Sequence, residues 1–229
     1  MIAGLAAVFA IGLAAPASAA AGDTSSYGVK CVGIVTCGPF AQSAYPAGPA
    51  TNSLANVNVA GLITTGVINT AANSSGASAS VADVNAPLTQ TSTLTAQLVS
   101  SQCSVNQNTG QVSGSSTITK GKISLLGSQP ITLDTNPAPN TTVVGLTGIA
   151  TVILNRQTTA NDGTLTVDAI YIQLLNGQEI TIASSSCSPT SNQVPMASGN
   201  GLVLGGGLLG MLVLGYAVRR RSLSARQAA

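Results

Sequence analysis

The chain has 229 residues, only 6% of them charged, and it contains no histidine and no tryptophan. A histidine base for a nucleophilic serine or cysteine is therefore excluded. Four of the eight basic residues lie in the last eleven positions. The rest of the chain therefore has four basic and six acidic residues, a formal charge of −2. Nucleic-acid binding is also excluded, because it needs a basic patch or stacking aromatics.

The composition predicts a packed all-β domain. Hydrophobic residues make up 45% of the chain, whereas disordered chains combine low hydrophobicity with high net charge. Threonine and valine favour strands, and glycine, asparagine and serine favour turns. Without its two apolar ends the chain has the length of one ordinary domain.

The N-terminal segment has the pattern of a secretory signal. An apolar run over residues 2–15 is broken by Pro16, and Ala17-Ser18-Ala19 is a small-x-small cleavage site. We expect residues 1–19 to be a signal peptide and the mature chain to begin at Ala20, with Ala21 or Gly22 as alternatives. Because no lysine or arginine precedes the apolar run, an uncleaved N-terminal membrane helix is the alternative.

Secretion would place the four cysteines in an oxidising compartment, where an even number favours full pairing. Of the three pairings, we favour a local Cys31–Cys37 loop and a long Cys103–Cys187 bridge. The alternative is a zinc site. It is disfavoured because structural zinc cysteines usually come in close pairs, whereas five residues separate Cys31 from Cys37 and the other two cysteines stand alone.

Residues 38–50 form a segment rich in proline and glycine that holds Phe40 and Tyr45. We expect this loop to cover one end of the domain. A loop that grips a ligand is the alternative.

From residue 56 onward, apolar–polar alternation recurs about every ten residues, and no helical pattern intervenes. In residues 92–101 it predicts that Leu94, Ala96 and Leu98 face the core. Such spacing is typical of an antiparallel β-sandwich or barrel. The many small residues leave a parallel β-solenoid as the alternative, but we find no fixed repeat.

Residues 148–187 give the clearest signal, an antiparallel meander of three strands. Its turns are Asn161-Asp162-Gly163 and Asn176-Gly177, residue types that tolerate the positive φ of tight hairpins. The middle strand places one set of side chains inward, namely Leu165, Val167 and Ala169. The alternation places Thr166 and Asp168 on the other, solvent-facing side.

Few residues are candidates for chemistry. Asp168 and Glu179 lie on adjacent predicted strands, as a carboxylate pair for glycoside hydrolysis would require, but we expect both to face solvent. Asn161-Asp162 supplies too few oxygens for a calcium site. Lys30, Lys120 and Lys122 could replace histidine as a general base, but no serine beside them stands out as a nucleophile. All three fit solvated strand positions. We therefore predict no catalytic residue, no cofactor and no metal.

The C-terminus has the pattern of a membrane anchor. Residues 201–218 are uninterruptedly apolar and would span about 27 Å as a helix, at about 1.5 Å per residue. Arg219, Arg220 and Arg221 follow at once, as a stop-transfer signal that stays in the cytoplasm. A buried soluble helix, the alternative, leaves these arginines unexplained.

These patterns predict five segments in chain order. They are a signal peptide (1–19), a β-rich extracellular domain (20–190), a linker (191–200), a transmembrane helix (201–218) and a cytoplasmic basic tail (219–229).

A short proline motif, Val194-Pro195-Met196-Ala197-Ser198, precedes the apolar segment. Together with the helix and basic tail it resembles the sorting signals of bacterial surface proteins. The sortase signal has Leu-Pro-any-Thr-Gly, so Val194, Ala197 and Ser198 depart from it. The exosortase-type (PEP-CTERM) signal often begins Val-Pro, but its second proline is missing here. A simple membrane anchor is the default.

The ectodomain contains three runs that resemble the choice-of-anchor P family: TNPAPNTTV (135–143), TVILNRQTT (151–159) and GTLTVDAIYI (163–172). The resemblance spans about residues 25–187. It implies a secreted bacterial β-protein with a surface anchor and no catalytic residues. A typical member has Asn-Glu-Gln at 155–157 and Asn-Ala-Leu-His at 168–171, so Arg156 and Tyr171 are departures.

Two classes of function follow. The first, which we favour, is a non-catalytic, membrane-anchored bacterial cell-surface protein with a structural or adhesive role. The second is a secreted module that binds envelope or matrix glycans, or an accessory domain of an enzyme. A flat threonine, serine and asparagine face would favour the first class, and a deep polar pocket would favour the second.

Overall fold

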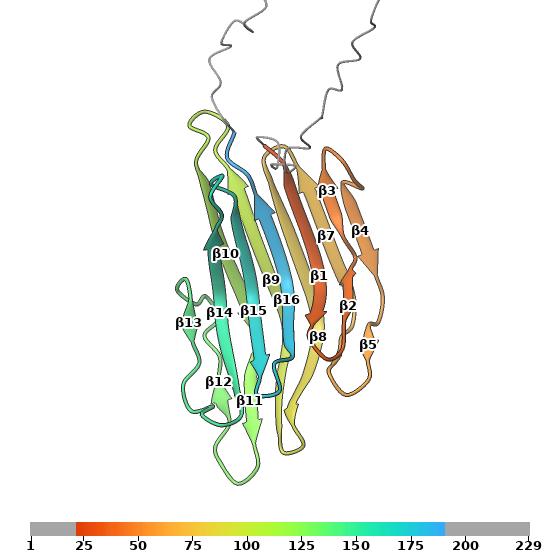
Figure 1. The fold of residues 1–229 in the computed structure, drawn as a ribbon, viewed down its shortest axis with the longest axis vertical. Helices are drawn as coiled ribbons and strands as arrows, with labels where there is room; N and C mark the ends of the chain where they lie inside the picture. Colours follow the sequence, from red (N-terminus) through yellow and green to blue (C-terminus); the bar gives the residue numbers. More distant parts are fainter. Residues whose placement is uncertain (1–21, 191–229) are drawn as a thin grey trace, which may run out of the picture. The chain divides into compact units, whose positions relative to one another are not determined.

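The computed structural model describes residues 22–190, which form sixteen strands and no helix (Figure 1). The predicted signal peptide, linker and transmembrane helix lie outside these residues. So do the proposed anchor residues Val194 and Pro195 and the arginines at 219–221.

The first sheet has seven strands in the order β13–β14–β15–β16–β1–β2, and β3 pairs with β1. The predicted meander forms β14, β15 and β16, and the N-terminal strand β1 lies beside the last of them. The strands are β1 (Thr24–Val32), β2 (Cys37–Phe40), β3 (Ser43–Tyr45), β13 (Thr141–Thr142), β14 (Ala150–Thr159), β15 (Leu165–Leu174) and β16 (Glu179–Cys187).

The second sheet has nine strands. The path β12–β11–β9–β8–β6–β5 forms its main order, β10 pairs with β9, and β7 joins β8 to β4. The strands are β4 (Thr51–Leu54), β5 (Asn58–Val59), β6 (Ile63–Thr64), β7 (Ile68–Asn73), β8 (Gly76–Thr89), β9 (Ser92–Val105), β10 (Val112–Thr119), β11 (Lys122–Leu125) and β12 (Ile131–Thr132).

The two sheets form a sandwich, so one of the predicted architectures is correct. Every strand pair within residues 22–190 is antiparallel, which makes the parallel solenoid wrong. The sheets stay open and separate, which makes the closed barrel wrong. Gly163 and Gly177 have φ of 85° and 79°, as expected for the hairpin turns that reverse the meander.

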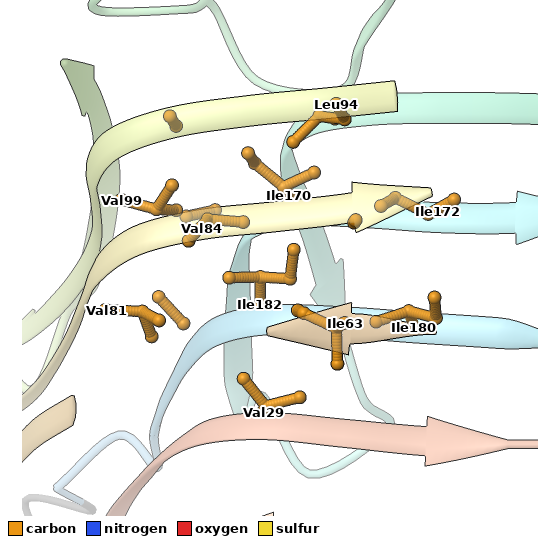
Figure 2. Packing of buried hydrophobic residues seen from close by; sticks show 14 of the residues in the cluster. Val29, Ile63, Val81, Val84, Leu94, Val99, Ile170, Ile172, Ile180 and Ile182 are labelled. Atoms are coloured by element: carbon orange, nitrogen blue, oxygen red, sulfur yellow. The ribbon is translucent and has the colours of Figure 1, made fainter. Parts of the chain in front are cut away.

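The core between the sheets consists mainly of branched aliphatic side chains (Figure 2). Ile170, Ile172 and Ile182 of the first sheet are fully buried against residues such as Val81 and Leu94 of the second. Full burial of such a side chain stabilises a fold by about 1.5–3 kcal/mol. Both sheets therefore contribute to one shared core.

The alternation of faces reverses once in the middle of the first sheet. On β15, Ala169 and Ile170 are consecutive and both lie in the core, so the residues on either side of them, Asp168 and Tyr171, share the outer face. The same reversal occurs on β16 at Ile182-Ala183, where Ala183 has a φ of 53°. Gly28 and Val29 repeat it on β1.

The second sheet reverses its faces in the opposite sense. On β9 the consecutive residues Gln97 and Leu98 are both exposed, and Val99 is buried. The prediction that Leu98 faces the core is therefore wrong: its side chain is 40% exposed. A prediction from the alternation of apolar and polar residues assumes that the strand is regular throughout. One irregularity exchanges the inward and outward faces for the rest of the strand.

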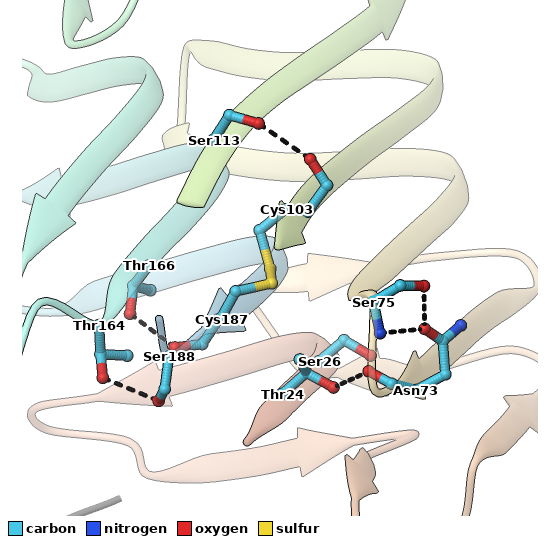
Figure 3. The surroundings of a disulfide bond; sticks show 12 residues. Thr24, Ser26, Asn73, Ser75, Cys103, Ser113, Thr164, Thr166, Cys187 and Ser188 are labelled. Atoms are coloured by element: carbon cyan, nitrogen blue, oxygen red, sulfur yellow. Dashed lines mark hydrogen bonds between the residues drawn. A yellow bond between two sulfur atoms is a disulfide. The ribbon is translucent and has the colours of Figure 1, made fainter. Parts of the chain in front are cut away.

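Two disulfides join Cys31 to Cys37 and Cys103 to Cys187, the pairing favoured from the sequence, and the zinc alternative is wrong. The second bond links β9 to β16 and so joins the two sheets (Figure 3). Nearby, Thr24 Oγ1 donates a hydrogen bond of 2.8 Å from β1 to the carbonyl oxygen of Asn73 on β7. This end of the sandwich is therefore cross-linked both covalently and by hydrogen bonds.

Loss of the long disulfide should destabilise the domain more than loss of the short one. The Cys103–Cys187 bond closes a separation of 84 residues and the Cys31–Cys37 bond one of 6. The chain-entropy model gives about 4–5 kcal/mol for the first and about 2 kcal/mol for the second. Chemical unfolding of the two double Cys→Ser variants would measure both, and an equal loss would contradict the expectation.

Substitution of Gly28 should destabilise the fold through overpacking. A Cβ at this position would lie 2.2 Å from Ile68 Cγ2, so Gly28→Ala should cost about 1–3 kcal/mol in the free energy of unfolding. In a double-mutant cycle, Ile68→Ala removes the clashing atom, and the double variant should lose less stability than the sum of the two singles. Simple additivity would refute this packing account.

Candidate functional site

The outer face of the second sheet carries a groove of about 630 Å³ that crosses five neighbouring strands. Its lining consists of three rows of residues paired in register across β4, β7, β8, β9 and β10. The outward-facing rows are Thr51, Ala71, Ser78, Gln102 and Ser115, and Ser53, Asn69, Ser80, Ser100 and Thr117. The row between them, Asn52, Thr70, Ala79, Ser101 and Ser116, contributes its backbone, and all of it but Asn52 is buried.

The strand pairing sets the spacing of the polar groups. Adjacent strands lie about 4.8 Å apart, and residues two apart on one strand lie about 6.7 Å apart. The groove is therefore a regular array of hydroxyl and amide groups. A hydroxyl or amide can both donate and accept hydrogen bonds, and no charged side chain lines the groove.

Several groove side chains are free to meet a ligand. Ser53 Oγ donates to Asn69 Oδ1 at 2.8 Å, so these two are engaged with each other at one edge. Within residues 22–190, the side chains of Ser78, Ser80 and Gln102 make no hydrogen bond to another residue. These three lie in the middle of the array, on β8 and β9.

The groove strand β7 is held in place by the β2–β3 segment. Thr70 is buried, and its Oγ1 donates to the carbonyl oxygen of Ala41 at 2.7 Å and bonds the hydroxyl of Ser43 at 2.8 Å. The segment predicted as a loop at 38–50 is thus partly β2 and β3, packed against β7. Phe40 packs on the core and Tyr45 is 40% exposed.

One side of the groove is bordered by apolar residues. The next outward row contains Val67, Ala82 and Leu98. Val67 and Leu98 are 44% and 40% exposed. Leu98 is exposed because β9 reverses its faces at this point. The reversal therefore gives the polar array an aliphatic margin.

The outer face of the first sheet carries the charged residues of the meander. Asp168 accepts hydrogen bonds from Arg156 Nε and Nη2 at 2.9 and 2.6 Å and from Ser184 Oγ at 2.7 Å. The Arg156 guanidinium lies 3.5 Å from the centre of the Tyr171 ring. The expectation that Asp168 faces solvent is wrong: it is 2% exposed, because these neighbours cover it.

Asp168 and Glu179 do not form a carboxylate pair. Asp168 pairs with Ser184 across the ladder, whereas Glu179 pairs with Gln173. Five residues along the strand separate the two positions by about 17 Å, and glycosidase carboxylates lie about 5–9.5 Å apart. Asp168 is also fully engaged by its hydrogen bonds, so this cluster holds the sheet together.

Two tyrosines on this face ionise less readily than usual. Burial raises the pKa of Tyr27 above its ordinary value, and the nearby Asp168 carboxylate raises it further. Burial likewise raises the pKa of Tyr171, and the neighbouring Glu179 carboxylate raises it further. Both phenols therefore favour the neutral form in the folded protein.

The remaining sequence candidates stay apart from one another. Lys30, Lys120 and Lys122 are exposed. Asp162 Oδ1 accepts a hydrogen bond from the Thr164 amide at 2.9 Å, as a turn residue would. In the part of the chain that the structure describes, no three His, Cys, Asp or Glu residues gather as metal ligands, and no helix has the length and apolarity to traverse a bilayer.

The groove was not predicted from the sequence. Its signal was present, because serines alternate with alanines in residues 76–81 and polar residues recur at 100, 102, 115 and 117. Only the strand register shows that these positions face the same way on neighbouring strands.

The chain matches no protein-family model, and neither a curated protein nor a solved structure is similar to it. Its resemblance to the choice-of-anchor P family therefore stays a prediction from sequence.

The shifted tyrosines predict a loss of stability at high pH. A folded pKa above the ordinary 10.0 gives stability that is complete below about pH 10 and is lost as the pH rises through the folded value. Tyr27→Phe, which cannot ionise, should show a shallower decline. Unfolding free energies measured at several alkaline pH values would test this, with Tyr45→Phe as the exposed control; an unchanged slope in Tyr27→Phe would rule it out.

Proposed function

We propose that this chain is a non-catalytic, membrane-anchored protein of the bacterial cell surface, and that its β-domain acts adhesively by binding a neutral glycan in the groove of the second sheet. The observation that carries the proposal is the groove itself, an array of hydroxyl and amide groups without a charged side chain. A neutral, hydroxyl-rich ligand can match this array without leaving a charge desolvated.

The proposed location has separate support. The apolar segment at 201–218, with its arginines, predicts a membrane anchor that leaves the β-domain outside the cytoplasm. The two disulfides fit an oxidising compartment. The choice-of-anchor P resemblance, which implies secreted bacterial proteins with surface anchors, agrees with both.

The shape of the groove favours an extended ligand. Its polar rows cross five strands, a width of about 19 Å at about 4.8 Å per strand. Hydrogen bonds made in exchange for water contribute only about 0.5–1.5 kcal/mol each, so useful affinity requires several of them along a polymer. The aliphatic margin at Val67 and Leu98 would cover the apolar faces of the sugar rings.

The sequence left two classes of function open. A flat hydroxyl face would favour the first, a structural or adhesive surface protein, and a deep polar pocket would favour the second, a secreted glycan-binding module or enzyme accessory domain. The groove has a volume within the range of about 300–1,000 Å³ found for ligand sites, and Ser78, Ser80 and Gln102 lack partners among the described residues. These features favour binding.

A charge placed in the groove should abolish binding of a neutral glycan. Gln102→Glu keeps the side chain's shape, removes an amide donor and adds a carboxylate that the ligand cannot neutralise. We expect binding to fall about tenfold or more, the equivalent of about 1.4 kcal/mol. Binding would be found on an array of neutral bacterial and matrix glycans and measured by calorimetry.

The matched control is Gln173→Glu, the same substitution at an exposed position of β15 in the other sheet, which should bind like the unmodified chain. Equal losses in both variants, or an array on which only charged glycans bind, would contradict the proposed site.

A further inference from the structure

Exposed aliphatic side chains gather at one end of the sandwich. The loops that join β1 to β2, β11 to β12, β13 to β14 and β15 to β16 lie at the end away from residues 22 and 190 (Figure 1). At this end are Val32, Ile34, Val35, Leu126, Val144 and Leu175, which we call the aliphatic tip. Four of the six are 73–81% exposed, although water disfavours exposed aliphatic side chains.

The tip is held in shape by hydrogen bonds from a buried side chain. Gln178 is 1% exposed; its Nε2 donates to the carbonyl oxygens of Val32 and Val35 at 3.0 and 2.9 Å, and its Oε1 accepts from the Val35 amide at 2.8 Å. The β1–β2 loop is thereby fixed to the β15–β16 hairpin. Leu175 of that hairpin and Val144 line one hollow. The loop between β13 and β14 therefore lies beside the β15–β16 hairpin.

The tip carries no charge. Residues 33–36, 126–130, 143–149 and 175–178 include no Asp, Glu, Lys or Arg. Glu179, which is partly buried, pairs with Val32 at the margin of the tip. The loops themselves offer no charged group, which favours an apolar occupant.

The tip is a poor fit for a flat protein surface. The six side chains offer at most about 500 Å² of exposed apolar area, taken from about 60–120 Å² per buried side chain. A stable interface between two copies needs about 800 Å² on each with close complementarity, which four separate loops do not provide.

We infer that the aliphatic tip inserts into the surface of a lipid bilayer. Lipid chains need no shape complementarity, and side chains on separate loops can each enter the boundary between headgroups and acyl chains. Because the tip is uncharged, zwitterionic lipid suffices and the binding should depend little on salt. The inference uses the geometry of residues 22–190 alone and is independent of glycan binding in the groove.

The absence of tryptophan from the chain makes a direct test available. A single tryptophan placed by Leu175→Trp in the full chain reports the surroundings of the tip, whichever other segment holds the chain on the membrane. With phosphatidylcholine vesicles we expect a blue shift of its emission and quenching by brominated acyl chains. Leu98→Trp, at an exposed mid-strand position of β9, is the control and should show neither.

Polar substitutions at the tip supply the second measurement. In the Leu175→Trp background, Ile34→Ser, Leu126→Ser and Val144→Ser should each weaken the vesicle-dependent quenching about tenfold. These positions are highly exposed, and intact disulfides and circular dichroism would show that the variants fold. An emission of Leu175→Trp that vesicles leave unchanged, or a blue shift that grows with protein concentration without lipid, would overturn the inference, the latter in favour of self-association.

Discussion

Burial of branched aliphatic side chains between two open sheets is the constraint on which the rest of this structure depends. The domain has few charges and almost no aromatic residues, so its stability rests on isoleucine, valine and leucine packed across the layers and on the Cys103–Cys187 bond that joins them. Each sheet must therefore keep its apolar face directed at the other along strands of up to fourteen residues. Strands β15 and β16 of the first sheet and β9 of the second each reverse their faces once along their length.

That reversal decides where the polar residues lie. In the first sheet, two consecutive inward residues bring Asp168 and Tyr171 to the same outer face, where Arg156 contacts both. In the second sheet, two consecutive outward residues place Leu98 beside the hydroxyl rows of the groove. The ion pair and the aliphatic margin of the groove thus each lie at a point where a strand reverses its faces.

The groove and the aliphatic tip are different kinds of surface. The groove lies on the broad outer face of a sheet, where main-chain hydrogen bonds fix the position of every hydroxyl. The tip lies on loops, where Gln178 supplies the rigidity that strand pairing cannot.

The sequence by itself determined the all-β antiparallel class, the meander of residues 148–187 and its turns, and the favoured cysteine pairing, because alternation and turn residues act over a few positions of the chain. Tertiary structure alone decided the burial of Asp168, the exposure of Leu98 and the assembly of the groove. Those features depend on the register between strands such as β4 and β10, which lie some sixty residues apart. A local pattern shows which residues alternate; it contains neither the register between distant strands nor the point at which packing reverses their faces.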